Sequence, residues 1–380
     1  MRRPIRFALI ALGLLAAWGL LLYCAGNPFD FRSFYAAGEL LRTQPHALYS
    51  LTAQSVAQRA AGGDALLPWA HPAAEAALFV PLTLLSFKTG FALWSALSIL
   101  MLAFSGYLLR DELRALRPAA HYALMIFLYV PISVGLLAGQ DHALFLLLWV
   151  LTWRSLKSGK DFNAGMYAGL SLIRYQFAIP ALLCLILLRK WKMFQGAAAS
   201  ALAMAAVSFA LVGADGARSY LTLVRSLSHT YDSIAIGRMP SLRGLMLFLV
   251  PAHHDVAAVI AILLLLLWAI VTIAKIGDLE IAFALATTVG VLADFHAFSY
   301  ELVVLVIPMA ILLAKRPAWI PAAWLLAIAC FAAGAWELHT ALFLTPLLLG
   351  FALWTGQSFA RRGLPETTKP LSEKLSPSKS

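Results

Sequence analysis

The sequence predicts an all-α polytopic membrane protein with about twelve transmembrane helices. Of its 380 residues, 62% are hydrophobic and 12% are charged, whereas an ordinary soluble domain is about half apolar and about a quarter charged. Apolar runs close to the roughly 20 residues needed to cross a bilayer recur from Phe7 to near Leu353, and the charges collect between them. We therefore expect one multi-span domain over residues 1–358. The polar tail 359–380 has too little apolar surface to pack and should be disordered in the cytoplasm.

The net charge of +11 does not indicate a nucleic-acid-binding protein. Lys and Arg fall in short loops between apolar runs and form no basic face, so membrane topology explains them better. The three cysteines stand singly in or beside apolar runs, which indicates neither a disulfide framework nor a metal site.

The first span is expected at Phe7–Ala25, uncleaved, with the N-terminus in the cytoplasm. Residues 27–89 then form the first extracytoplasmic loop. Its second half is apolar but interrupted by Pro72 and Pro81, which favours interfacial helices over a straight span.

The remaining spans follow from the rule that basic clusters stay in the cytoplasm. Phe162–Leu188 has basic residues at both ends and Arg174 near its middle, so we predict two short spans that form a hairpin with Arg174 at the outer turn. The other predicted segments are span 2 (Gly90–Leu109), span 3 (Ala119–Ala138), span 4 ending before Arg154, span 7 (Phe194–Val212), an outer loop from Gly213 to about Arg243, span 8 (Val256–Ala274), span 9 (Ile281–Leu292), span 10 ending at Lys315, and spans 11 and 12 before Arg361. Both termini are then cytoplasmic.

This topology places the remaining polar residues on the outer side. They are Asp30, Arg32, His71, Gln140, Asp141, His142, Arg174, Gln176, the loop 229–243, Asp294, His296 and Glu301. Any chemistry is therefore expected at the outer surface.

Asp30 and Arg174 are the main candidates for function. Asp30 is either an ordinary interfacial charge or a base placed to take a proton from a hydroxyl. An arginine within an apolar stretch costs at least about 2.5 kcal/mol and usually has an anionic partner. For Arg174 that partner is either a carboxylate in a structural ion pair (Asp30, Asp294 or Glu301) or a phosphate.

Weaker candidates lie at the same predicted depth. His296, between Asp294 and Glu301, is either incidental or a donor to a phosphate, and Gln140-Asp141-His142 has a similar position. Arg238 and Arg243 either anchor an outer loop or bind an anion. No segment has the pattern of a nucleotide-binding loop or a zinc site, so we expect no cofactor and no metal.

Four pieces of the chain, in order, resemble glycosyltransferase family 87 (DUF2029), the polyprenol-phosphate-mannose-dependent transferases. They are Asp30-Phe31 with Phe34 to Gly38 and Leu48-Tyr49, the stretch Pro72 to Trp94, Gly139-Gln140 followed by Gly165 to Gln176, and Ser241 to Gly244 followed by His296 to Pro308. The resemblance covers roughly 29–308. Two positions differ from the family, which tends to have Lys-Pro at Arg174-Tyr175 and Tyr-Asp at Tyr300-Glu301. The type of charge is kept at both.

The resemblance implies a GT-C fold and an inverting transfer of a hexose, mannose first, from a polyprenyl-phosphate sugar to a glycan or glycolipid hydroxyl. It implies Asp30 as the catalytic base and His296 near the phosphate. The expected substrate-binding residues are Arg174, His296, Arg243, Gln140, Tyr35 and Glu301. The expected location is a bacterial inner membrane, with the active site on the extracytoplasmic side.

Two other functions fit the pattern. A secondary transporter also commonly has twelve spans with both ends inside, although transporters place ionisable residues near the midplane and often show repeated halves. A non-catalytic partner in envelope assembly is the third, and it predicts that Asp30, Arg174 and His296 do not converge.

Overall fold

The computed structural model describes residues 29–63, 65–227, 233–335 and 340–360. All regular structure in these segments is helical, without a strand. The predicted span 1 lies outside the described residues, as does the polar tail from residue 361.

Six helical segments among the described residues are long and apolar enough to cross a bilayer. They correspond to α5 (Phe87–Leu108), α7 (Pro118–Ala138), α11 (Trp191–Leu227), α14 (His254–Lys275), α17 (Ile320–Ala335) and α18 (Thr340–Ala360). Outward leucines such as Leu202, Leu263 and Leu267 are at least 61% exposed, which suits contact with lipid. The chain is thus a membrane protein, and each of these helices overlaps a predicted span.

Shorter helices occupy several other predicted spans. They are α8 (His142–Lys157), α9 (Asp161–Leu170), α10 (Tyr175–Cys184), α15 (Leu279–Ala293) and α16 (Val306–Lys315), the last preceded by η6 (Ser299–Leu305). At about 1.5 Å per residue, a ten-residue helix is about half as long as the hydrocarbon core is thick. The total of twelve spans therefore stays a prediction.

Two short helices with a break between them occupy the segment predicted as a hairpin around Arg174, while their crossing of the membrane and the outer position of Arg174 stay predictions. Helices α9 and α10 are separated by η3 (Ser171–Arg174), so Arg174 lies at the break. Lys190 Nζ, beyond α10 and η4 (Ile186–Leu188), lies 3.0 Å from Asp161 Oδ1 at the start of α9. This ion pair joins the two ends of the segment, so both ends lie on one side.

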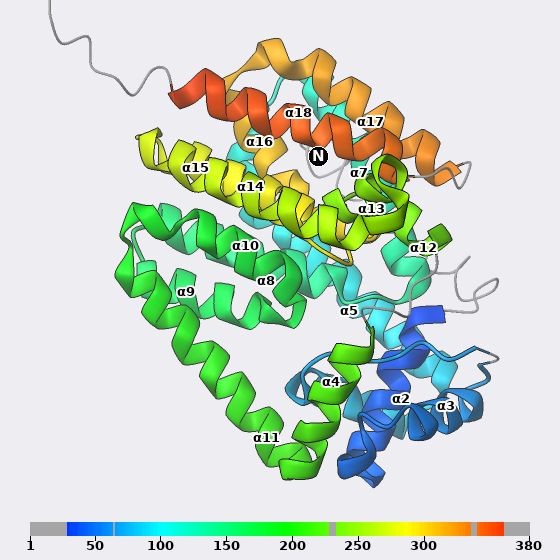
Figure 1. Cartoon of the computed structure of the whole chain (residues 1–380). Helices are drawn as coiled ribbons and strands as arrows, with labels where there is room; N and C mark the ends of the chain where they lie inside the picture. Colours follow the sequence, from blue (N-terminus) through cyan, green and yellow to red (C-terminus); the bar gives the residue numbers. More distant parts are fainter. Residues whose placement is uncertain (1–28, 64, 228–232, 336–339, 361–380) are drawn as a thin grey trace, which may run out of the picture.

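The segment predicted as the first outer loop folds into a helical unit. It contains α2 (Phe29–Thr43), η1 (Pro45–Ala47), α3 (Leu51–Ala60), α4 (Ala73–Phe79) and η2 (Val80–Leu84), which lie together at the lower right of Figure 1. Phe31 and Phe34 lie on one face of α2 and pack with Phe79 and Trp69 in a small aromatic core. This core fixes α2 against α4.

The outer loop predicted from Gly213 to about Arg243 begins where α11 is kinked, and a second helical part of α11 follows the kink as far as Leu227. Gly213 does interrupt the helix, with a φ of 69° that glycine adopts without strain. His46 Nδ1 contacts the carbonyl oxygen of Val212 at 2.9 Å and so satisfies a group next to the break. The chain then forms α12 (Ser233–Gly237) and α13 (Leu242–Leu249), with η5 (Pro251–His253) before α14.

Charged residues at one end of the helices join several predicted cytoplasmic loops. Lys157 Nζ lies 2.8 Å from Glu112 Oε1, on α6 (Arg110–Arg114), and 2.9 Å from Glu280 Oε1. Lys315, just before η7 (Pro317–Trp319), also pairs with Glu280, at 2.8 Å. Residues that the charge rule placed in the cytoplasm therefore share one side of the protein.

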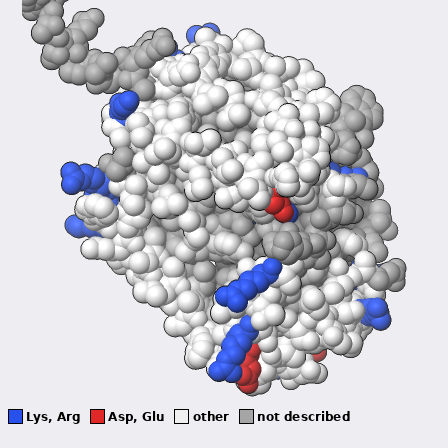
Figure 2. Space-filling model, viewed as in Figure 1, with Lys and Arg blue, Asp and Glu red and all other residues white. Residues whose placement is uncertain are grey.

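Most of the face seen in Figure 2 consists of uncharged residues, and its Lys and Arg lie chiefly along the left margin and in the lower part. A broad, mostly uncharged surface is what a bilayer-embedded protein requires.

Candidate active site

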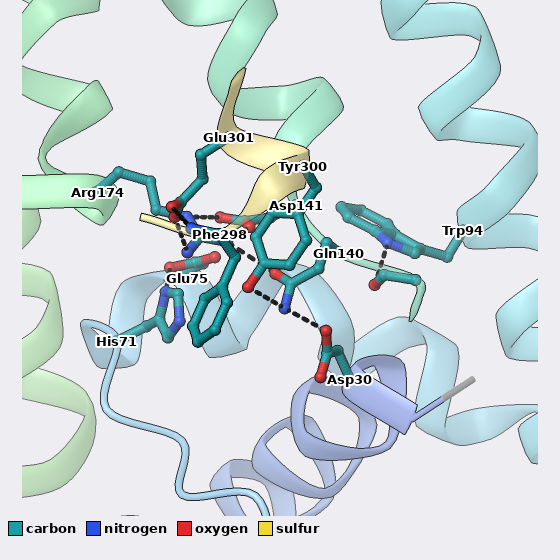
Figure 3. Close-up of polar contacts among 11 residues, drawn as sticks. Asp30, His71, Glu75, Trp94, Gln140, Asp141, Arg174, Phe298, Tyr300 and Glu301 are labelled. Atoms are coloured by element: carbon teal, nitrogen blue, oxygen red, sulfur yellow. Dashed lines mark hydrogen bonds and ion pairs between the residues drawn. The ribbon is translucent and has the colours of Figure 1, made fainter. Parts of the chain in front are cut away.

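Three turns that are distant in sequence bring a polar cluster together (Figure 3). One is the turn between α7 and α8, which carries Gln140 and Asp141, and another is the break before α10, which carries Arg174. The third is η6, which carries Tyr300 and Glu301. The start of α2 adds Asp30 from below.

Gly139 explains how α2 reaches Gln140. It ends α7 in the left-handed conformation, with a φ of 72°, and the following Gln140 N–H bonds back to Gly135 O at 2.9 Å. A Cβ on Gly139 would lie 2.5 Å from Phe31 Cβ, so only glycine allows α2 this close. Trp94 Nε1 also donates to the Gly139 carbonyl oxygen, at 3.0 Å.

Gln140 connects Asp30 to Arg174. Its Nε2 donates to Asp30 Oδ2 at 2.8 Å and to the Tyr300 hydroxyl oxygen at 3.2 Å, while its Oε1 accepts from Arg174 Nη2 at 2.7 Å. The buried amide can therefore make all of these hydrogen bonds only with Nε2 toward Asp30 and Oε1 toward Arg174. Asp30 was one of the carboxylates considered as an ion-pair partner of Arg174. The two residues are connected through the Gln140 amide.

Arg174 is held by carboxylates. Its Nη1 donates to Glu301 Oε1 at 2.8 Å, and Nε and Nη2 both donate to the Asp141 carboxylate. With the bond to Gln140, four of its five N–H groups have partners. Of the partners considered from the sequence, Glu301 is present. Asp141, for which only its position was considered, accepts two further hydrogen bonds from Arg174.

Burial sets the protonation of Asp30. It raises the pKa of Asp30 above its ordinary value, and the hydrogen bond from Gln140 and the charge of Arg174 partly offset this. A carboxylate with a raised pKa is a stronger base. Asp30 Oδ1 has no hydrogen-bond partner in the described part of the chain, so it is placed to accept a proton.

Arg243 and His296 form a second group at the other end of the loop 294–301. Arg243 is buried, its Nε donates to Asp255 Oδ1 at 2.7 Å, and its guanidinium lies over the Phe295 ring. Burial, together with the nearby charge of Arg243, lowers the pKa of His296 to about 4. At neutral pH His296 is therefore uncharged, so it can donate one hydrogen bond but adds no positive charge.

Tyr35 does not join the cluster. Its hydroxyl donates to the Leu85 carbonyl oxygen at 2.8 Å, and its ring contacts Phe31 and Phe87. These contacts connect α2 to the start of α5.

Sequence reasoning missed Glu75. It lies on α4 with its side chain fully buried, and its Oε2 is 2.9 Å from His71 Nδ1. A usable signal was the acidic residue in the first turn of a helix that begins after Pro72, with His71 just before it.

An apolar cavity of about 440 Å³ adjoins the cluster. It is lined by α4, α8, α9, η3 and α11, and its residues include the apolar Leu78, Leu148 and Met204. Glu75 also lines it, as does Ile173, the residue before Arg174. Its lining suits a hydrocarbon chain.

The family profile of glycosyltransferase family 87 matches residues 69–308 of the chain, which confirms the family that the sequence resembles. The match includes Gln140, Asp141, Arg174, Tyr300 and Glu301 and begins after Asp30. Comparison with curated proteins and with solved structures gave no match.

Proposed function

Because the chain belongs to glycosyltransferase family 87, we propose that it moves a hexose, mannose first, from a polyprenyl-phosphate sugar to an acceptor hydroxyl on the extracytoplasmic side. The acceptor is a glycan or glycolipid, and the transfer inverts the anomeric carbon. The membrane is the bacterial inner membrane, and the overall architecture is of the GT-C type.

The observation that carries this proposal is a partly buried carboxylate held at the edge of a buried polar cluster that adjoins an apolar cavity. Asp30 Oδ2 is fixed by Gln140, and Oδ1 is available to an acceptor hydroxyl. In the proposed reaction Asp30 takes the hydroxyl proton while the oxygen attacks the anomeric carbon. The bond to the phosphate oxygen breaks on the opposite face, and the phosphate leaves on its lipid.

The cavity supports a lipid-linked donor. Its lining of Leu, Met, Ala and Val side chains would hold isoprenoid units, and the part lined by Glu75 and Ile173 would place the phosphate near Arg174. His296, in the loop 294–301, and Arg243, at the start of α13, are proposed to contact the phosphate or the sugar. Tyr35 is proposed to contact the acceptor.

The two other functions fit these observations less well. A family of glycosyltransferases does not indicate a secondary transporter. A scaffold without catalysis gives no reason for Asp30 and Arg174 to share one amide, although His296 lies in the second group, with Arg243.

The test is Asp30→Asn. This change keeps the shape and a hydrogen-bonding side chain but removes the base, so transfer should fall by at least about 10²-fold. The assay follows radiolabelled sugar from polyprenyl-phosphate mannose, glucose or arabinose into acceptors in membranes, and it also identifies the sugar.

Asp215→Asn is the matched control, because Asp215 is exposed and pairs only with Arg218 among the described residues. It should leave transfer unchanged. Expression and donor binding should survive in both variants. Full turnover in the Asp30→Asn protein would eliminate Asp30 as the base.

A further inference from the structure

Three side chains that can ligate a metal converge beside Arg174. One ligand atom each from His71, Glu75 and Asp141 lies within 4.8 Å of the others. His71 lies just before α4, Glu75 lies in its first turn and Asp141 lies in the turn before α8, so the group bridges the first helical unit and the transmembrane helices (Figure 3).

The group contains more carboxyl groups than cations. Asp30, Glu75, Asp141 and Glu301 place four carboxylates around the single guanidinium of Arg174. Buried carboxylates are costly unless a proton, a cation or hydrogen bonds compensate them. Arg174 already donates four of its N–H groups and has little capacity left.

Glu75 gives a second, independent indication. The residue is 2% exposed, and its Oε1 is buried without a hydrogen-bond partner in the described residues. The other oxygen contacts His71 Nδ1 at 2.9 Å. The Asp141 carboxylate lies within 4.8 Å and, when ionised, cannot donate a hydrogen bond to Glu75. An acceptor oxygen buried against two other potential ligands points to a bound cation.

We propose that His71, Glu75 and Asp141 bind one divalent metal ion of the Mn²⁺ or Zn²⁺ class. One imidazole and two carboxylates form a mixed nitrogen and oxygen donor set, which suits these ions better than an all-oxygen cage suits Ca²⁺. Asp141 can hold Arg174 and the metal together, because each carboxylate oxygen has two lone pairs. This inference replaces the expectation of no metal.

Three protein ligands leave a coordination position open. If the proposed function holds, an oxygen of the donor phosphate would occupy this position. Without the metal, the carboxylates of the cluster would repel the phosphate. The metal would then supply charge that neutral His296 does not.

The test is metal binding by the purified full chain, and it needs no activity. Protein stripped with a chelator is titrated with Mn²⁺, and free Mn²⁺ is measured by electron paramagnetic resonance, with Zn²⁺ as competitor. Wild type should bind one Mn²⁺ or Zn²⁺ per chain. Glu75→Gln and His71→Gln should each weaken binding by about tenfold or more.

Glu39→Gln is the control, because Glu39 lies in the same helical unit and pairs with Arg42 at the surface. It should bind like wild type. In case the variants fold poorly, electron spin-echo measurements on wild type with bound Mn²⁺ should show coupling to an imidazole nitrogen.

Three results would overturn the site. They are wild-type protein without stoichiometric binding, unchanged affinity in both ligand variants, and bound Mn²⁺ without nitrogen coupling. The Asp30→Asn protein separates this proposal from the proposed function, because it should lose transfer and still bind the metal.

Discussion

At the scale of single residues, the sequence identified most residues of the cluster but not the hydrogen bonds and ion pairs that join them. Asp30, Gln140, Arg174 and Glu301 stand out because polar side chains between apolar runs are costly without a purpose. The contacts among them depend on turns whose geometry no local pattern specifies. Glu75 was missed because a lone glutamate beside a proline-interrupted apolar stretch resembles an interfacial charge.

The contacts make Gln140 a positioning residue for Asp30. Gln140→Leu keeps the volume but removes the hydrogen bond to Asp30, so kcat should fall by about tenfold, in line with the net value of a hydrogen bond to a charged group, while KM changes little. Rates of transfer at varied donor concentration measure this split. A rise in KM alone would assign Gln140 to donor binding.

The pH profile gives an independent measure of Asp30. The base works as a carboxylate, so activity should fall as pH falls through its pKa, and burial places this limb above the range of an exposed aspartate. The bond from Gln140 lowers that pKa, so Gln140→Leu should move the limb to higher pH. A limb that stays in place would show that another group controls it.

At the scale of elements, apolar runs and basic clusters predicted most helices, including the broken hairpin at Arg174. The extension of α11 beyond Gly213 was missed because its second half is polar enough to be read as a loop. The packing of α2 could not be predicted from the sequence either, because it depends on the glycine that ends α7 and on an aromatic core assembled from separate segments.

Gly139 tests this packing. Gly139→Ala must place an alanine at positive φ and push Phe31 away, whereas Gly159→Ala has a similar φ of 70° but nothing within 4 Å of the new Cβ. The first change should cost about 1–3 kcal/mol more stability than the second and should also reduce transfer. Thermal unfolding in detergent measures the difference. Equal losses of stability in the two variants would mean that the close approach of Phe31 to Gly139 does not contribute to stability.

At the scale of the whole molecule, the positive-inside rule grouped loops that the structure brings together. Lys157, Glu280 and Lys315 meet at one side, as expected for cytoplasmic loops. The sequence could not give the direction of each short helix, because the hydrophobic lengths of α8, α9, α10 and α15 are ambiguous. The sidedness of the cluster therefore stays a prediction.

Cysteine labelling tests that sidedness. In a chain with Cys24, Cys184 and Cys330 replaced by serine, Phe29→Cys and Ala252→Cys should react with an impermeant maleimide added to intact cells. Both positions are exposed, and they flank Asp30 and the Arg243 group respectively. Ser158→Cys, also exposed, should react only after permeabilisation. Reaction of positions 29 and 252 from opposite sides would refute a single outer pocket.

The bonds of Arg174 also have a consequence for biogenesis. Its guanidinium depends on Asp141, made earlier in translation, and on Glu301, made much later. A nascent chain that ends before η6 must hold this arginine in the bilayer with only part of its final counter-charge. Completion of the pocket is thus a late step in insertion, and truncated chains should be preferred substrates for membrane quality-control proteases.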